Sequence, residues 1–600
     1  MKEYKVKTIT LIIGVLSIFP VGAQTFEHLD INNINARINA NSYLFHNPDS
    51  SSSSYEFPAN SGINSIFSAR LNLASTDVNG QVIGHIPFTG VVGPHAGPIM
   101  NPSDYATSGP AWDKVWKIDC STIETFKEWY SCSEDANCDA SANFPGYQIP
   151  QSILEWPAHG VSALGQSSQI APFFDTDGDD FYDPNVGDYP LIKGNQAIFF
   201  IYNAKRTQSI LPSVQIEFRG LAYAYGNTGD SALDNTIFID YEVINRSTAT
   251  LANAQLGFDV DFDLGNASDD FIASDVARSA FYAYNGDSND EDGPGSLGYG
   301  ANLAAQGVVF LNGGFQDNDG LDNPLTQNIQ NAIDSAGSPY PNLGIGYGDG
   351  IVDNEQFGLT NFLAYSNNTG LTGQAVSAIN YYHQTNGKWN DGTSMVWGGT
   401  GHLSSGGTVN SNMLFPGDSD PLLWSTQGIN TPTSNWSEVS EANPQGDRKG
   451  VGSVGPVTLE PGQVQKLTIA LVSARDYSSS GPQAAVNIMK ERIDSIHSYF
   501  RTGILTECIP SISTGIQDEK AKENNLLIYP SPFNNQFTLN YSLENNTAIL
   551  AIYNVVGKII KTQTVTQNST VVDLSKQPSG FYFITITDGD KKMSQKIIKQ

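Results

Sequence analysis

The feature that most constrains the fold of this chain is a series of short apolar runs with the two-residue period of a β-strand. Residues 236–245 alternate between apolar and polar side chains and are rich in aromatic and β-branched residues, as expected for a half-buried strand. Residues 214–225 follow a similar pattern, in which Gly220 predicts a β-bulge. Residues 197–202 are apolar throughout, which is typical of a strand buried on both faces. These runs predict a mainly β protein.

Turns and ordered loops must be extensive, because the chain contains 57 Gly and 30 Pro. The pair Pro461-Gly462 predicts a tight turn between a strand at 457–460 and a strand at 466–472. We therefore expect a multi-domain body rich in β-sandwiches, with long loops joining its strands.

Few segments predict helices. Ser121 and Glu124 have the spacing of a capping box, which predicts a short helix through Trp129. The strongest helix signal lies at 483–500, where five apolar residues form one stripe: Ala485, Met489, Ile493, Ile496 and Phe500.

The ends of the chain differ from its middle. At 600 residues the chain exceeds what one hydrophobic core usually serves, so two to four domains are expected. Three lysines precede an apolar run at 9–19 and small residues at 21–23, which predicts a secretory signal peptide, residues 1–23. The apolar run is shorter than the about 20 residues that span a bilayer, and no second long apolar run follows. We expect export without a transmembrane segment.

Residues 527–600 contain a series of motifs in a fixed order. They are LIYPSP at 527–532, IYNVVGK at 552–558, DLS at 573–575, PSGFYF at 578–583 and KIIK at 596–599. In order and spacing, these motifs resemble the C-terminal sorting domain of type IX (Por) secretion cargo. The resemblance implies a small Ig-like β-sandwich that binds the type IX secretion machinery. It also implies a protein that is secreted or attached to the outer-membrane surface.

Residues 508–526 contain Pro510, Gly515 and a charged run, and they predict a linker before this tail. The acidic, β-rich body then spans residues 24–507, with room for two or three subdomains. Phrases such as DGD at 177–179 and GDYP at 187–190 make the body resemble other large secreted proteins with the same tail. That second resemblance implies no activity.

Charge excludes some partners. The chain carries a net charge of −30. Since residues 527–600 carry +3 and residues 1–23 carry +2, the rest of the chain carries about −35. Such a body repels nucleic-acid phosphates and anionic membrane surfaces. The acidic residues can serve solubility outside the cell, the binding of divalent cations, or both.

One loop has the composition of a calcium site. Residues 175–183 read DTDGDDFYD, and alternate carboxylates on a tight loop can converge on one calcium ion. An EF-hand would need Gly and Glu where Asp180 and Val186 stand, so the loop is of another type. The alternative is a solvated Asx-turn loop. The predicted ligands of this structural calcium are Asp175, Asp177, Asp179, Asp183 and, more distantly, Asp188.

A second acidic stretch alternates along a predicted strand. Side-chain alternation places Asp259, Asp261 and Asp263 on one face, where carboxylates without a cation repel one another. The segment therefore predicts either a cation or a solvated sheet face. If a metal binds, the predicted ligands are Asp259, Asp261 and Asp263, together with Asp269 and Asp270. Acidic loops at 317–322 and 349–355 are weaker candidates for the same chemistry.

The cysteines are sparse: Cys120, Cys132, Cys138 and Cys508. Four cysteines allow three pairings, of which a local Cys132–Cys138 bridge is the simplest in an oxidising compartment. Zinc is the alternative, but the spacing is not CxxC and no histidine lies among the three clustered cysteines.

Catalytic motifs are missing from the sequence. It contains no HExxH, GxSxG or Walker motif. A glycosidase needs only two suitably spaced carboxylates, which this acidic chain does not exclude. Clusters of Trp and Tyr at 112–116 and 381–397 predict either sugar stacking or an aromatic core. The sequence favours a calcium-stabilised adhesion, binding or structural surface protein with a polysaccharide or protein ligand. The alternative is an extracellular hydrolase.

Overall fold

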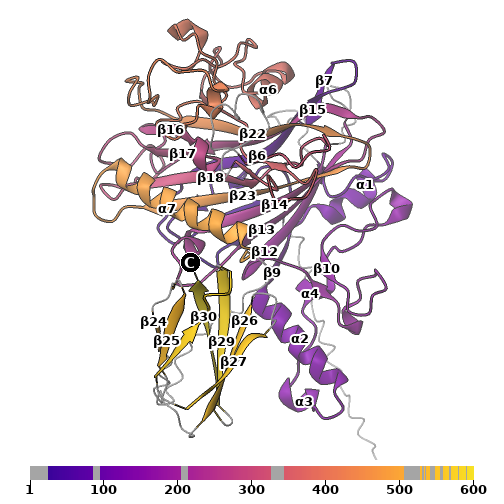
Figure 1. Ribbon diagram of the computed structural model, residues 1–600. Helices are drawn as coiled ribbons and strands as arrows, with labels where there is room; N and C mark the ends of the chain where they lie inside the picture. Colours follow the sequence, from indigo (N-terminus) through magenta and orange to yellow (C-terminus); the bar gives the residue numbers. More distant parts are fainter. Residues whose placement is uncertain are drawn as a thin grey trace, which may run out of the picture. The chain divides into compact units, whose positions relative to one another are not determined.

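The computed structural model describes residues 25–85, 95–204, 214–325, 343–505 and, with short gaps, 527–599 (Figure 1). The chain forms two compact units, Met1–Ile512 and Ser513–Gln600. Their boundary falls within the expected linker, 508–526. The predicted signal peptide, 1–23, and the predicted linker, 508–526, lie outside the described residues, so both stay predictions.

A large antiparallel sheet forms one layer of the body. Its strand order is β16-β17-β18-β23-β14-β13-β12-β8, with β9 also paired to β12. In chain order these strands are β8 (His95–Ala96), β9 (Trp116–Asp119), β12 (Gln196–Asn203), β13 (Ile216–Ala224), β14 (Thr236–Asn245), β16 (Asp270–Asp275), β17 (Ala280–Asn285), β18 (Ala304–Asn312) and β23 (Val464–Arg475).

A second antiparallel sheet, in the order β21-β22-β15-β6-β7, packs against the first. Its strands are β6 (Ile66–Thr76), β7 (Val82–His85), β15 (Leu251–Phe262), β21 (Asn361–Ser366) and β22 (Arg448–Leu459). Aromatic rings join the two sheets: the rings of Phe281 and Phe362 stack at 4.8 Å. Gly452 leaves room for this contact, because a Cβ there would lie 2.6 Å from the Phe281 ring. The body is therefore a β-sandwich with one continuous core.

The turn at Pro461-Gly462 joins the sheets. Strand β22 belongs to the smaller sheet and β23 to the larger one, so the strand–turn–strand unit crosses the sandwich. The prediction of a bulge at Gly220 is wrong, because β13 pairs with β12 and β14 without a register shift there. Gly220 instead makes room for the Phe200 ring, which a Cβ would meet at 2.1 Å.

Short strands and loops surround the sandwich. The pairs and small sheets are β1 (Phe26–Leu29), β2 (Asn35–Asn39) and β5 (Tyr55–Glu56); β3 (His46–Asn47) and β4 (Ser52–Ser53); β10 (Phe173–Phe174) and β11 (Tyr189–Pro190); β19 (Gly344–Ile345) and β20 (Gln356–Phe357). The α-helices of the described residues are α1 (Tyr105–Ser108), α2 (Cys120–Glu134), α3 (Ala140–Asn143), α4 (Gln151–Leu154), α6 (Ala378–Thr385) and α7 (Pro482–Arg501).

The helix predicted at 483–500 is confirmed as α7, which lies along β17, β18 and β23 (Figure 1). Its apolar stripe packs on the outer face of the large sheet, where Met489 and Ile493 contact the position of Gly307. The predicted capping box is not formed. Helix α2 begins at Cys120 and ends at Glu134, with Asp119 as its N-cap. Because Asp119 already ends strand β9, which pairs with β12, the chain enters the helix before Ser121.

The second unit is a small β-sandwich with its own core. One sheet has the order β24-β25-β28 and the other β27-β26-β29-β30. The strands are β24 (Leu527–Tyr529), β25 (Gln536–Asn540), β26 (Ala548–Asn554), β27 (Ile559–Val565), β28 (Ser569–Asp573), β29 (Gly580–Asp588) and β30 (Lys591–Lys599). The mainly β fold is thus confirmed in both units. In the part of the chain that the structure describes, no helix is long and apolar enough to span a bilayer.

Candidate functional site

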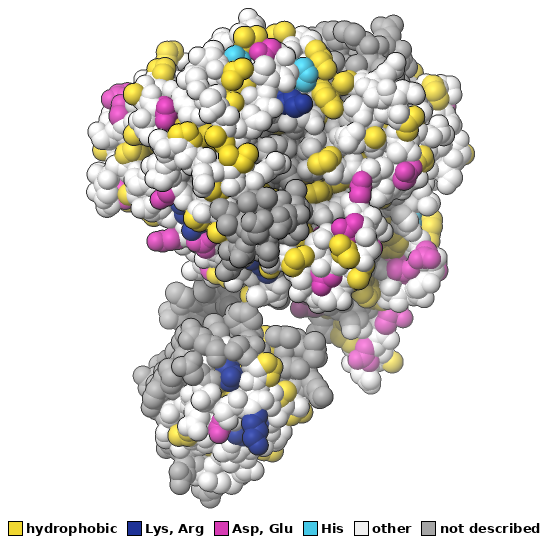
Figure 2. Space-filling model, turned by 45° about the horizontal axis from the view of Figure 1, so that its top comes forward, with side chains coloured by type: hydrophobic (Ala, Val, Ile, Leu, Met, Phe, Trp, Pro, Cys, Tyr) yellow, Lys and Arg dark blue, Asp and Glu magenta, His cyan; other side chains and the backbone are white. Residues whose placement is uncertain are grey.

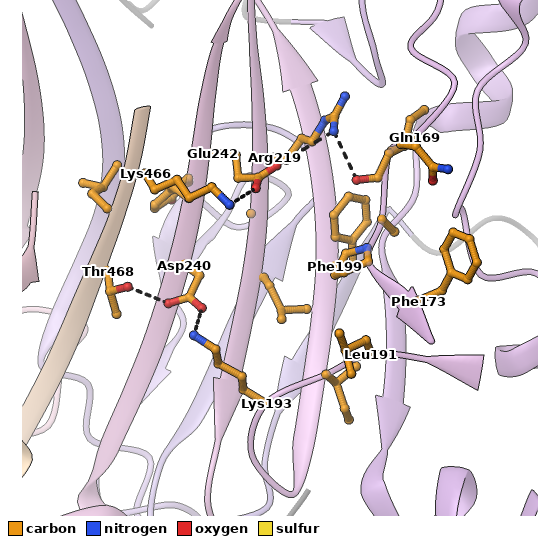
Figure 3. Close-up of a pocket in the computed structure, with 18 of the residues that line it drawn as sticks. Gln169, Phe173, Leu191, Lys193, Phe199, Arg219, Asp240, Glu242, Lys466 and Thr468 are labelled. Atoms are coloured by element: carbon orange, nitrogen blue, oxygen red, sulfur yellow. Dashed lines mark hydrogen bonds and ion pairs between the residues drawn. The ribbon is translucent and has the colours of Figure 1, made fainter. Parts of the chain in front are cut away.

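A groove of about 930 Å³ lies on the outer face of the large sheet (Figure 3). Its floor comes from β12, β13, β14 and β23, and Phe500 of α7 borders it. One wall consists of two loop segments, 169–175 and 191–193. Segments far apart in the sequence therefore build this groove together.

Charged side chains form the floor of the groove in two groups. Lys193 Nζ lies 2.6 Å from Asp240, and the Thr468 hydroxyl donates to the same carboxylate at 2.8 Å. Next to them, Lys466 Nζ lies 2.9 Å from Glu242. Asp240 and Glu242 share a face because they are two residues apart on β14. Donors and acceptors thus alternate along the floor.

Arg219 connects this floor to the wall. Its guanidinium lies 2.7 Å from the buried carboxylate of Glu217 and 3.8 Å from Glu242. It also donates to the backbone carbonyl of Ile170 at 3.4 Å. Glu217 lies on the same strand as Arg219, and Glu242 lies on the neighbouring strand β14. The guanidinium is therefore held between the floor of the groove and the segment that contains Ile170.

Apolar side chains line the other part of the groove. Phe173, Phe199 and Leu191 stand across from the charged pairs in Figure 3. An apolar surface beside paired donors and acceptors is what a sugar ring contacts, since a sugar has C–H faces and hydroxyl edges. The lining carries four acidic and three basic side chains, which leaves no strong attraction for an anionic polymer. Figure 2 likewise shows acidic side chains over the visible face of the body with few basic ones among them.

The predicted calcium loop borders this groove, because Asp175 and Asp180 belong to its lining. Carboxylate oxygens of Asp175, Asp177 and Asp188 lie within 4.8 Å of one another. The structure thus brings together three of the five predicted ligands. Asp179 instead accepts a hydrogen bond from the Phe181 amide, and Asp183 caps the turn at Asn185.

Backbone amides hold the loop in shape. Asp188 is fully buried and accepts hydrogen bonds from the amides of Thr176 and Asp183 at 2.8 and 2.9 Å. Asp175 accepts from Gly178 and Asp180, and these amides hold its pKa below the usual range. Asp177 is exposed, and desolvation together with the neighbouring carboxylates raises its pKa. A cation beside it would favour its charged form.

The acids of β15 have cations supplied by the protein itself. Arg70 on β6 is the register partner of Asp259, and its guanidinium lies 2.8 Å from that carboxylate. Lys449 on β22 is the register partner of Asp261, and its Nζ lies 2.6 Å from it. The Tyr365 hydroxyl also donates to Asp259 at 2.7 Å. We call these residues the β15 ladder. A metal is thus not required at Asp259 or Asp261, and metal binding there stays a prediction.

Burial still changes the acids at the end of this strand. It raises the pKa of Asp261 to about 7 even though Lys449 opposes the shift. It also raises the pKa of Asp263, which accepts a hydrogen bond from Ser53, to about 6. The other two predicted ligands, Asp269 and Asp270, lie at the beginning of β16, and no ion pair of the described residues includes them.

The acidic loops at 317–322 and 349–355 bind each other through backbone amides. Asp353 accepts from the amides of Asp319 and Gly320, and Asp322 accepts from those of Gly348 and Gly350. Their carboxylates thus form turn contacts between two loops.

Other predictions are settled by burial and bonding. The Cys132–Cys138 disulfide is confirmed. Trp389 and Trp397 are buried, so these aromatic residues belong to the core and do not stack on a ligand.

The sequence analysis did not predict that the residues on the floor of the groove form a site. The only signal was the polar face of the strand at 236–245, which carries Asp240 and Glu242.

Comparison with known proteins bears on the tail. The fold is that of a β-rich protein with a sandwich body and a small C-terminal sandwich. Residues 527–600 match the family described as the secretion system C-terminal sorting domain. The chain is therefore type IX secretion cargo, delivered to the cell surface or the extracellular space.

Two further comparisons concern the whole chain. The sequence gives no match among curated proteins. Among solved structures, a polysaccharide lyase aligns at 10% identity with a TM-score of 0.17, covering 72% of this chain and 43% of the lyase chain. The alignment thus spans less than half of the lyase, and a TM-score this low supports no inference about activity.

Proposed function

We propose that the body is a surface-delivered binding protein whose groove takes a neutral polysaccharide. The supporting observation is the floor of the groove, where Lys193–Asp240 and Lys466–Glu242 alternate opposite Phe173 and Leu191. Sugar hydroxyls both donate and accept hydrogen bonds, so they can bridge such pairs without a net charge on the ligand. An anionic polymer is repelled by a body of about −35.

Affinity measurements with the mature full-length protein test this proposal. We expect binding to neutral glucans, mannans or xylans and not to pectate or alginate. Lys466→Ala and Asp240→Asn should each weaken binding by about tenfold, since each removes a hydrogen bond to a charged group. Lys114→Ala, which removes a lysine paired with Glu155 outside the groove, should leave binding unchanged. Unchanged affinity of both groove variants would contradict the proposal.

A hydrolase is the second candidate, because Asp240 and Glu242 lie two residues apart on one strand face. Their Cα atoms are about 7 Å apart along the strand, so the two carboxyl groups can reach the separation that glycosidases use. Both carboxylates are already paired with lysines, so neither is placed as a free proton donor. Release of reducing sugar in the same samples, and its loss in Glu242→Gln, would establish the hydrolase instead.

We further propose that calcium holds the loop of Asp175, Asp177 and Asp188, and through it one wall of the groove. The convergence of the three carboxylates within 4.8 Å supports this assignment, and oxygen ligands suit calcium. Polysaccharide binding should then be weaker in EDTA than in calcium. Equal affinity for the polysaccharide in calcium and in EDTA would show that calcium in the loop does not contribute to binding in the groove.

Delivery by the tail is tested separately. A chain that ends at Asn525 should accumulate in the periplasm, whereas residues 527–600 fused to a folded reporter should bring it to the cell surface or the medium. Surface delivery of the truncated chain would contradict the role of the tail.

A further inference from the structure

A second group of carboxylates lies away from both the groove and the calcium loop. Asp269 and Asp270 stand at the beginning of β16, the edge strand of the large sheet. Asp290 comes from the connection between β17 and β18. All three side chains are buried, and Asp270 is fully buried.

Hydrogen bonds satisfy only part of this group. Asp290 accepts from the amides of Asn266 and Tyr299 at 3.0 and 2.8 Å. Asp270 accepts one long bond, 3.3 Å, from the Leu264 amide, while its Oδ1 is buried without a partner. Both carboxylate oxygens of Asp269 are also buried without one. Asp270 Oδ1 is therefore left without a partner in the protein interior, and the Asp269 oxygens have no close hydrogen bond, which is costly.

The local backbone is built around these acids. Gly265 has φ +70°, and a Cβ at this position would lie 2.0 Å from Asp290 Oδ2. No other residue fits there without displacing the carboxylate. Asn285 is the register partner of Asp270, and its buried side chain lies near Asp269, whose pKa it lowers against the effect of burial. Gly265, in the turn after β15, and Asn285, at the end of β17, thus lie next to the carboxylates of this group.

Charge distinguishes this group from the β15 ladder. Arg70 and Lys449 neutralise Asp259 and Asp261, whereas no lysine, arginine or histidine of the described residues forms an ion pair with Asp269, Asp270 or Asp290. Burial, together with the neighbouring carboxylates, raises the pKa of all three. An ordered water could satisfy the free oxygens but would leave the charge uncompensated.

We propose that Asp269, Asp270 and Asp290 bind a divalent cation of the calcium type, at a site separate from the loop at 175–188. Carboxylate and amide oxygens without histidine or cysteine select a hard cation. The three carboxylates do not converge within 4.8 Å as those of the loop do, so a bound ion would have to draw them together. The bound ion would join the β15–β16 turn to the β17–β18 connection.

Thermal unfolding of the mature full-length protein tests this site, with calcium chloride as the probe. In an Asp177→Asn background, which weakens the loop, calcium should still raise the melting temperature by at least about 2 °C over EDTA. Adding Asp290→Asn should abolish that rise, and adding Asp287→Asn, an exposed acid of the same connection, should not. A rise that survives Asp290→Asn, or that is absent before it, would overturn the proposal.

Asp270→Asn distinguishes a metal ligand from a protonated acid. The amide mimics the neutral carboxylic acid, so a protonated Asp270 predicts an unchanged response to calcium, which would overturn the proposal. A ligand predicts loss of the response. Because a variant can fail to fold, metal content after desalting is measured on the unmutated chain and on Asp177→Asn. One equivalent should remain bound in the variant; none would overturn the site. These readouts do not depend on polysaccharide binding, so the failure of either proposal is recognised separately.

Discussion

Two neighbouring stretches of this chain solve the same electrostatic problem differently. In the β15 ladder, the register of the sheet places Arg70 opposite Asp259 and Lys449 opposite Asp261. A few residues later, Asp269 and Asp270 stand at the beginning of the edge strand β16. Among the described residues, no lysine or arginine of a neighbouring strand forms an ion pair with them. In the ladder the flanking strands supply the cations. On the edge strand β16, the cations that pair with Asp275 are Arg278 and Lys490, and they come from outside the sheet, whereas Asp269 and Asp270 have none among the described ion pairs.

The largest expected effect comes from breaking the ladder. Arg70→Met leaves Asp259, which is nearly buried, with Tyr365 as its remaining side-chain partner. We expect a loss of about 3–5 kcal/mol in the free energy of unfolding, measured by urea denaturation. The double variant Arg70→Met, Asp259→Met removes both charges and should recover most of the loss. A single variant as stable as the unmutated protein would show that the pair contributes nothing.

The calcium loop ranks second. Calcium at a hundred times its dissociation constant should stabilise the folded state by about 2.7 kcal/mol. Calcium should therefore raise the melting temperature, and EDTA should increase proteolysis near residues 175–190. Asp177→Asn should remove most of this difference, while Asp518→Ala, in the linker, should not. Melting curves that superimpose in calcium and EDTA would leave a loop held by its amides alone.

The third prediction concerns pH. Burial raises the pKa of Asp261 in the folded state to about 7, above its ordinary value of 3.8, so the folded state binds this proton more tightly than the unfolded state. The contribution of Asp261 to stability therefore increases as pH falls from 7 to 4.

Denaturation at pH 8, 6 and 4 measures this effect. The unmutated protein should gain on the order of 2 kcal/mol over Asp261→Asn between pH 8 and pH 4. The free energy of unfolding of Asp113→Asn, at an exposed position, should change with pH in the same way as that of the unmutated protein. Parallel curves for Asp261→Asn as well would mean that Lys449 compensates fully for burial.

The smallest effect is expected for an ion pair outside the ladder. Lys114 and Glu155 lie 3.3 Å apart at the surface, where water screens the charges. Lys114→Ala should change the free energy of unfolding by less than about 0.5 kcal/mol. A loss comparable with that of Arg70→Met would remove the distinction between buried and exposed pairs on which the comparison depends.

Local sequence was sufficient to predict individual strands, helices and the disulfide. Alternation at 236–245 gave β14, the apolar stripe at 483–500 gave α7, and the spacing of Cys132 and Cys138 gave their disulfide. These features depend on residues a few positions apart, whose side-chain periods are set by backbone geometry. The ordered motifs at 527–600 likewise established the route of export.

Local sequence was insufficient where partners come from distant segments. The capping box at Ser121 failed because strand β9 runs directly into α2, and the bulge at Gly220 failed because the residue makes room for Phe200. Three of five loop acids converge, since the others are used as turn acceptors.

By itself the sequence determined that this is an exported, mainly β, acidic protein, and it identified which acids need compensation. Only the tertiary structure decided how each acid is compensated. Arg70 and Lys449 lie 189 and 188 positions from their partners, and the groove combines segments from 169 to 500. Coulomb energy depends on distance in space and on burial, and neither is set by position along the chain.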